Sequence, residues 1–148
     1  MKWPVLWIGM GVVVDQLTKA YAQAELTFFS AVTVCKGLRF QLVHNYGAAY
    51  GLFHQYTGVL VALNACIIGG IIWYLWRYYH RPLAQAGFYF VLMGAMGNGI
   101  DRLVRGYVVD FIDIRIFPVF NIADVLINLG AICLILDALR TNRDSRAT

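Results

Sequence analysis

The sequence predicts an all-α polytopic membrane protein of four transmembrane helices that carries a small extracytoplasmic β-sheet. Of the 148 residues, 60% are hydrophobic and only 14% are charged, whereas soluble globular proteins carry about 25% charged residues. The hydrophobic residues fall in blocks, and each block approaches the roughly 20 residues that a helix needs to cross the hydrocarbon. Short stretches of alternating polarity outside the blocks favour strands. The length fits one domain, residues 1–148.

Four blocks are the predicted spans, at about residues 5–24, 56–76, 83–101 and 122–139. Open backbone cannot face lipid, so isolated spans of this length must be helical. Asp15 and Lys19 interrupt the first span, but they lie four residues apart and therefore share one helix face. A cleaved secretory signal is the alternative for this block, because Ala22-Gln23-Ala24 has the small-x-small form of a cleavage site. Polar residues that can face a helix bundle favour the uncleaved helix.

Two stretches outside the spans have the period of a half-buried strand. Hydrophobic and polar residues alternate from Leu38 to Val43, and Gly37 before this stretch and Asn45-Tyr46-Gly47 after it are turn signals. A second alternation runs from Ile112 to Ile116, after Asp110. We expect a small sheet on the membrane surface, although Asn45-Tyr46-Gly47 could be no more than a turn.

Polar residues gather where the third span ends and the fourth begins. Asn98, Asp101 and Arg102 close the third span. Asn121 and Asp124 open the fourth, and Asp110 lies on the predicted connector between them. Asp15 can join this cluster from the first span. Ionisable groups at or inside a bilayer are costly, and a functional role is therefore the default interpretation.

Asp110 and Asp124 are the candidates for a catalytic pair. Two neighbouring carboxyls in a low-dielectric site do not both ionise readily, so one keeps its proton and the other can act as a base. Such a pair can activate water against an amide carbonyl. The position of Asp124 near a helix amino terminus favours its ionised form. Two structural alternatives stay open: Asn121 and Asp124 could only cap a helix, and Asp101-Arg102 could only anchor a helix end.

Several other function classes find no support in the sequence. The net charge of +4 is dispersed, and no basic run interleaved with aromatic residues indicates nucleic acid. The three cysteines and three histidines have no spacing typical of a metal site or a disulfide framework.

The orientation in the membrane is predicted from the positive residues. Lysine and arginine residues are balanced between the two sides of the membrane, but dense arginine clusters at residues 77–81 and in the C-terminal tail favour cytoplasmic termini.

The chain resembles signal peptidase II, the prolipoprotein signal peptidase family of bacteria, over nearly its whole length. Any one of the matching motifs is weak, whereas five in this order within four spans are highly specific. The motifs are Asp15-Gln16-Leu17-Thr18-Lys19, Asn45-Tyr46-Gly47-Ala48-Ala49, Gly97-Asn98-Gly99-Ile100-Asp101-Arg102, Val108-Val109-Asp110-Phe111 and Phe120-Asn121-Ile122-Ala123-Asp124. Tyr50 stands where the family commonly has phenylalanine, and the segment between Asp110 and Phe120 looks short.

The resemblance implies an intramembrane aspartyl endopeptidase of the bacterial cytoplasmic (inner) membrane. It implies four helices, cytoplasmic termini, and an extracytoplasmic β-cradle formed by about residues 25–55 and 102–121. The family removes signal peptides from diacylglyceryl-modified prolipoproteins, just before the lipidated cysteine. The catalytic pair falls on Asp110 and Asp124. The residues that line or support the site are Asp15, Asn45, Gly47, Asn98, Asp101, Arg102 and Asn121.

The implied partners are this substrate and membrane lipids, with no nucleic acid, metal or cofactor, and the implied inhibitor is globomycin. We expect a monomer. Two other classes of protein fit part of the sequence. A small cation-coupled transporter would use Asp15 as its coupling residue, but transporters bind near the membrane midplane, whereas these carboxylates gather at one boundary. A purely structural membrane protein would explain the spans but not the clustered aspartates.

Overall fold

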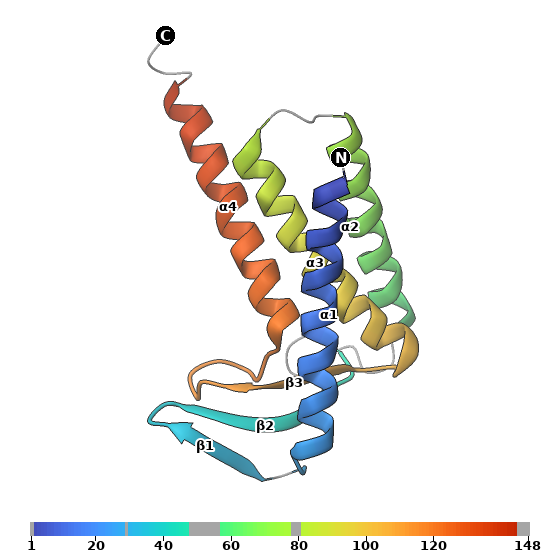
Figure 1. Cartoon of the computed structure of the whole chain (residues 1–148), viewed down its shortest axis with the longest axis vertical. Helices are drawn as coiled ribbons and strands as arrows, with labels where there is room; N and C mark the ends of the chain where they lie inside the picture. The colour runs from blue at the N-terminus through green and yellow to red at the C-terminus, as the bar shows by residue number, and fades with distance from the viewer. Residues whose placement is uncertain (1, 29, 48–56, 78–80, 145–148) are drawn as a thin grey trace.

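Over the residues that it describes, the computed structural model has four long helices with a three-stranded sheet across one end of the bundle (Figure 1). It describes residues 2–28, 30–47, 57–77 and 81–144. The beginning of α1 and the end of α4 lie at the end of the bundle away from the sheet (Figure 1). The predicted fold class, helices plus a small sheet, is therefore confirmed at this level. Ala48, Ala49 and Tyr50 lie outside the described residues.

The helices fall where the hydrophobic blocks predict them. They are α1 (Lys2–Glu25), α2 (Thr57–Arg77), α3 (Pro82–Val104) and α4 (Ile122–Asp144). Both α3 and α4 extend beyond the predicted spans at their C-terminal ends. Pro82 lies in the first turn of α3, where its missing N–H leaves no hydrogen bond unmade.

The outer surface of the bundle is apolar. Large hydrophobic side chains are exposed on all four helices, among them Leu17 at 64%, Ile67 at 51%, Leu103 at 70% and Leu139 at 58%. Apolar surface of this extent marks contact with lipid or another protein. Among the residues that the structure describes, two helices are long and apolar enough to cross a membrane by length and composition, Gly58–Arg77 and Ile122–Arg143.

The sheet has the order β1-β2-β3 and is antiparallel throughout. Its strands are β1 (Ala31–Cys35), β2 (Leu38–Asn45) and β3 (Val108–Asp113). The strand predicted at residues 38–43 is confirmed as the central strand. The strand predicted at residues 112–116 is misplaced, because β3 begins at Val108 and ends at Asp113.

Asp110 therefore lies within a strand and not on a connector. Val108, Val109, Asp110 and Phe111 are all buried, at 2%, 0%, 2% and 8% exposure. A strand covered on both faces loses the alternation that reveals a half-buried strand, and for this reason the sequence pattern pointed to the wrong stretch.

Glycines allow α3 and α4, the most extensively packed pair of helices, to approach closely. A Cβ atom on Gly130 would lie 2.6 Å from the carbonyl oxygen of Gly87. A Cβ atom on Gly94 would collide with the carbonyl oxygen of Ala123, in the first turn of α4. This close packing fixes the start of α4 against α3, and Asp124 lies at that start.

Candidate active site

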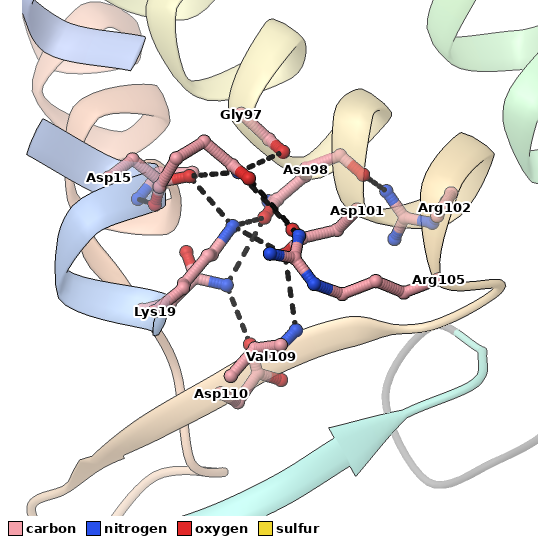
Figure 2. Close-up of polar contacts among 12 residues, drawn as sticks. Asp15, Lys19, Gly97, Asn98, Asp101, Arg102, Arg105, Val109 and Asp110 are labelled. Atoms are coloured by element: carbon pink, nitrogen blue, oxygen red, sulfur yellow. Dashed lines mark hydrogen bonds and ion pairs between the residues drawn. The ribbon is translucent and has the colours of Figure 1, made fainter. Parts of the chain in front are cut away.

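The polar residues predicted to cluster do converge, at the junction between the helix ends and the sheet (Figure 2). α1 contributes Asp15, the last turns of α3 contribute Asn98 and Asp101, and β3 contributes Asp110. Asn121 directly precedes α4, and Asp124 lies in its first turn. Asp15, Asp101 and Asn121 have no exposed surface. Segments more than 100 residues apart in sequence thus supply one buried polar network, as the 108-residue separation between Asp15 and its partner Ala123 illustrates.

Both carboxylate oxygens of Asp110 accept a hydrogen bond from a side-chain amide. Asn121 Nδ2 donates to Oδ1 at 2.6 Å, and Asn45 Nδ2 donates to Oδ2 at 2.9 Å. Val43 of β2 pairs with Asp110 of β3, and Asn45 lies two residues further along the same face of β2. Burial raises the pKa of Asp110 to about 7; the charge of Asp124 adds to this rise, and the two amide donors oppose it. Asp110 is therefore suited to hold a proton near neutral pH.

Gly47 fixes the orientation of the Asn45 amide. The backbone N–H of Gly47 donates to Asn45 Oδ1 at 3.2 Å, which is the hydrogen bond of an Asx turn. Because a backbone N–H can only donate, the amide oxygen must face Gly47, and the NH₂ group then faces Asp110. The predicted turn at residues 45–47 therefore also orients the Asn45 amide that donates a hydrogen bond to Asp110.

Asp124 caps its own helix and contacts α3. The N–H of Asp124 donates to Asn121 Oδ1 at 3.0 Å, and the N–H of Asn121 donates to Asp124 Oδ2 at 3.2 Å. This reciprocal pair is a capping box, so the capping interpretation is correct, but capping is not the only contact. Asn98 Nδ2 of α3 donates to the other oxygen, Asp124 Oδ1, at 2.9 Å. Both oxygens of Asp124 therefore accept a hydrogen bond, and the side chain lies at a helix amino terminus.

Arg102 lies beside the carboxylates, but among the described residues it forms no ion pair with them. Its guanidinium donates to the backbone carbonyl of Asn98 at 3.5 Å, within its own helix. Its charge acts at longer range on Asp124, Asp110 and Asp101. Arg102 therefore contributes positive potential to the site.

The sequence predicted that Lys19 shares a helix face with Asp15, but its contact with Asp101 and the contributions of Arg105 and Gln16 were not predicted. Lys19, with no exposed surface, bridges Asp15 and Asp101 at 2.8 Å each. Arg105 pairs with Asp101, and its guanidinium also donates to Gln16 Oε1 at 3.1 Å. Gln16 and Lys19 lie within the first quoted motif, and Arg105 lies one helical turn after Asp101. That spacing was the available signal.

An open cavity of about 530 Å³ adjoins the two candidate catalytic residues. Asp110, Asp124 and Asn45 lie at its polar end. The remaining wall is mostly apolar and comes from the segment after β3 and from one face of α4, including Phe117, Val119, Phe120, Val125, Leu129 and Ile132. The cavity can therefore hold a ligand with one polar group at the aspartates and an apolar body along α4. Within the described ranges, no three His, Cys, Asp or Glu residues are placed to hold a metal ion.

The fold is that of a bacterial membrane enzyme. Two solved structures described as bacterial membrane enzymes match it: one with a TM-score of 0.91 and 27% identity, covering 97% of this chain and 92% of that one, and one with a TM-score of 0.86 and 28% identity, covering 94% of each.

Sequence comparison identifies which membrane enzyme family this is. Residues 7–140 match the family described as signal peptidase (SPase) II. The lipoprotein signal peptidase of Clostridium novyi is 36% identical, covering 94% of this chain and 99% of its own length. That of Parasynechococcus marenigrum is 38% identical, covering 97% and 93%. The chain belongs to the signal peptidase II family and is a protease.

Proposed function

We propose that this protein is an intramembrane aspartyl endopeptidase that removes the signal peptide from diacylglyceryl-modified bacterial prolipoproteins, cutting before the lipidated cysteine. One observation carries the proposal: Asp110 and Asp124, from different elements, line the polar end of one largely apolar cavity. The names of the relatives supply the substrate class, lipoproteins with signal peptides. The lipid and the signal helix are apolar, and the apolar wall along α4 matches them chemically.

Asp124 acts as the base and Asp110 as the acid in the proposed reaction. Asp124 takes a proton from water while the water oxygen attacks the scissile carbonyl carbon, and the proton of Asp110 moves to the carbonyl oxygen. The tetrahedral intermediate then breaks its C–N bond. In this step Asp124 protonates the leaving amine, and Asp110 recovers a proton from the intermediate's hydroxyl. Both carboxyl groups return to their starting states, and Asp15, Asn45, Gly47, Asn98, Asp101, Arg102 and Asn121 support them.

The proposed membrane arrangement places all four helices across the bacterial inner membrane as a monomer. Both termini are then cytoplasmic, and the sheet and the aspartates lie near the extracytoplasmic face. Two features support this arrangement: the beginning of α1 and the end of α4 lie away from the sheet (Figure 1), and apolar side chains are exposed on each of the four helices. Asp15 and Lys19, which interrupt the first span, are fully buried in the bundle. Burial against each other lowers the free-energy cost of placing these charged groups within a span.

The test is a cleavage assay with purified protein in detergent. The substrate is a diacylglyceryl-modified prolipoprotein, and the matched control is the same precursor without the lipid. We expect the mass of the product to locate the cut immediately before the lipidated cysteine, and we expect the unlipidated precursor to stay intact. Efficient cleavage of the unlipidated precursor would contradict the proposed substrate class. Absence of cleavage by folded protein on a verified lipidated substrate would contradict the proposed function.

The pH dependence of cleavage should reveal the proton on Asp110. Because its pKa is about 7, we expect kcat/KM to fall as the pH rises through about this value and the acid is lost. Asn45→Ala removes a donor that favours the ionised form, so the descending limb of the profile should move to higher pH. The measurement is kcat/KM against pH for both proteins.

Asn142→Ala is the matched control for this substitution, because Asn142 lies near the C-terminal end of α4, away from the cavity. Its pH profile should coincide with that of the wild type. A descending limb that stays in place in Asn45→Ala would show that Asp110 is not the acid that this limb reports.

A further inference from the structure

Lys19 is a fully buried lysine whose ammonium hydrogens all have partners. The nitrogen lies 2.8 Å from Asp15 Oδ2, 2.8 Å from Asp101 Oδ2 and 2.9 Å from Asn98 Oδ1. An ammonium group has three donors and no acceptor. Its three hydrogens therefore match three acceptors, two of them carboxylates and the third the amide oxygen of Asn98 (Figure 2).

This contact fixes which way the Asn98 amide faces. An NH₂ group cannot face an ammonium, so Oδ1 must point to Lys19, and Nδ2 is left to donate to Asp124 Oδ1 at 2.9 Å. The same Oδ1 accepts from Asn121 Nδ2 at 3.1 Å, and Asn121 Nδ2 also donates to Asp110 at 2.6 Å. The Asn121 amide is oriented by the backbone N–H of Asp124, which donates to its Oδ1 at 3.0 Å. Lys19 and Asn121 therefore both hold the Asn98 amide with its donor toward Asp124, and Lys19 is the charged and shorter of the two contacts.

We propose that Lys19 is a positioning residue that keeps the shared proton of the pair on Asp110 by locking the Asn98 amide with its donor toward Asp124. The inference rests on the proposed function and concerns the same site. Without Lys19 only the 3.1 Å hydrogen bond from Asn121 Nδ2 holds the amide in this orientation, and whenever the amide turns its oxygen faces Asp124. A carboxylate next to that oxygen is repelled, whereas a protonated carboxyl can donate to it. Asp124 would then keep the proton that a general base must lack.

The decisive comparison is between Asp15→Asn and the double variant Lys19→Met with Asp15→Asn. Lys19→Met alone leaves two buried carboxylates short of a cation, which threatens folding. The double variant removes one positive and one negative charge together, and Asp101 keeps its pair with Arg105. In the double variant an asparagine at position 15 can still accept from the N–H of Ala123, as Asp15 Oδ1 does at 2.8 Å. In Asp15→Asn alone the same orientation turns the NH₂ group toward the ammonium of Lys19, so the wild type is measured as a second reference.

We expect the double variant to lose about 10²-fold in kcat relative to Asp15→Asn, with KM changed by less than about 3-fold, since general base catalysis contributes rate and not binding. The acidic limb of its pH profile, which reports ionisation of the base, should move up by about one pH unit because Asp124 loses a donor. Lys36→Met, at an exposed lysine in the β1–β2 turn, is the matched control and should leave both limbs in place.

Other ionisable groups around the pair do not account for such a shift. His44 of β2 stacks on Tyr107, with ring centroids 3.8 Å apart, and alternates with Asn45 to the other face of the sheet. His44 is present in both Asp15→Asn and the double variant, so a difference between their pH profiles reflects the loss of Lys19. The charged residues packed around the pair, which are likewise common to both variants, are Asp101, Arg102 and Arg105.

Asn98→Asp tests the same idea with Lys19 intact. The new carboxyl can donate to Asp124 only when it is protonated, so we expect cleavage to be confined to lower pH than in the wild type. An acidic limb that is unmoved in the double variant, or a wild-type profile in Asn98→Asp, would overturn the role of Lys19. So would loss of cleavage by folded Asn98→Asp at every pH. Cleavage that survives Asp124→Asn would instead overturn the proposed function.

Discussion

Asp110→Asn and Asp124→Asn should each lower kcat/KM for the lipidated precursor by at least about 10³-fold, because each removes one half of the acid and base pair. Asparagine has nearly the shape of aspartate but cannot take a proton from water or give one to the carbonyl oxygen. At position 124 the amide oxygen can still accept the N–H of Asn121, so the start of α4 should keep its cap. The measurement is product formation by gel shift and mass, with circular dichroism and thermal unfolding in detergent as the check on folding.

Asp137→Asn is the matched control on the same helix. Asp137 lies far from the cavity and forms a 3.3 Å ion pair with Arg81, which is the partner that sequence reasoning did not foresee. We expect cleavage within about 2-fold of the wild type, because the pair lies far from the cavity and its Arg81 side is exposed to solvent. Cleavage that survives loss of Asp110 but not of Asp124 would move the acid to another carboxyl, with Asp101 the first candidate.

Gly94→Ala should both destabilise the protein and impair cleavage. The added Cβ atom would collide with the carbonyl oxygen of Ala123 and would lie 2.6 Å from Ile127 Cγ1. Backbone cannot give way as a flexible side chain can, so α4 must shift, and overpacking of this kind costs about 1–3 kcal/mol. The shift begins one residue from Asp124. We therefore expect a lower melting temperature and at least about a 10-fold loss of kcat/KM, because small misplacements of catalytic groups are costly.

Gly69→Ala is the control for this substitution. Gly69 also lies within a helix, α2, but an added Cβ atom would meet nothing within 4 Å in the described residues. Alanine favours a helix over glycine by about 1 kcal/mol, so the melting temperature should stay level or rise and cleavage should be unchanged. If Gly94→Ala behaved in the same way, the close contact of α3 with the start of α4 would not be needed for the site.

The helices were predictable because hydrophobic length is a strong signal, and each block became one helix. The strands were harder. β2 has one half-buried face and was visible as an alternation, whereas β3 is covered on both faces and carries Asp110 into the interior. Asp110 lies in the sheet because it pairs with Val43, which is 67 residues away in the sequence. A local sequence pattern cannot reveal a pairing between such distant residues.

The candidate site, like the fold, could be predicted from the sequence only in part. Spacing of three residues was enough to place Asn98 beside Asp101 and Asn121 beside Asp124, because both pairs lie on helices or helix ends. The direction of each hydrogen bond was not predictable, since it follows from which donor-only group meets each amide. Lys19 illustrates this limit: its spacing predicted a partner in Asp15, but the contacts with Asn98 and Asp101 depend on how α1 packs on α3.

The exposure of the cavity wall has a consequence for how the rate of this enzyme should be expressed. Val125, Leu129 and Ile132 line the cavity and are 37%, 43% and 52% exposed on the apolar side of α4. A precursor held in the bilayer by its own acyl chains can reach that wall by lateral diffusion alone, in two dimensions. The concentration that governs encounter is then the mole fraction of precursor in the lipid or detergent phase. Adding micelles or lipid at fixed amounts of enzyme and precursor lowers the mole fraction of precursor and slows turnover, although the molar concentrations of enzyme and precursor in the tube have not changed.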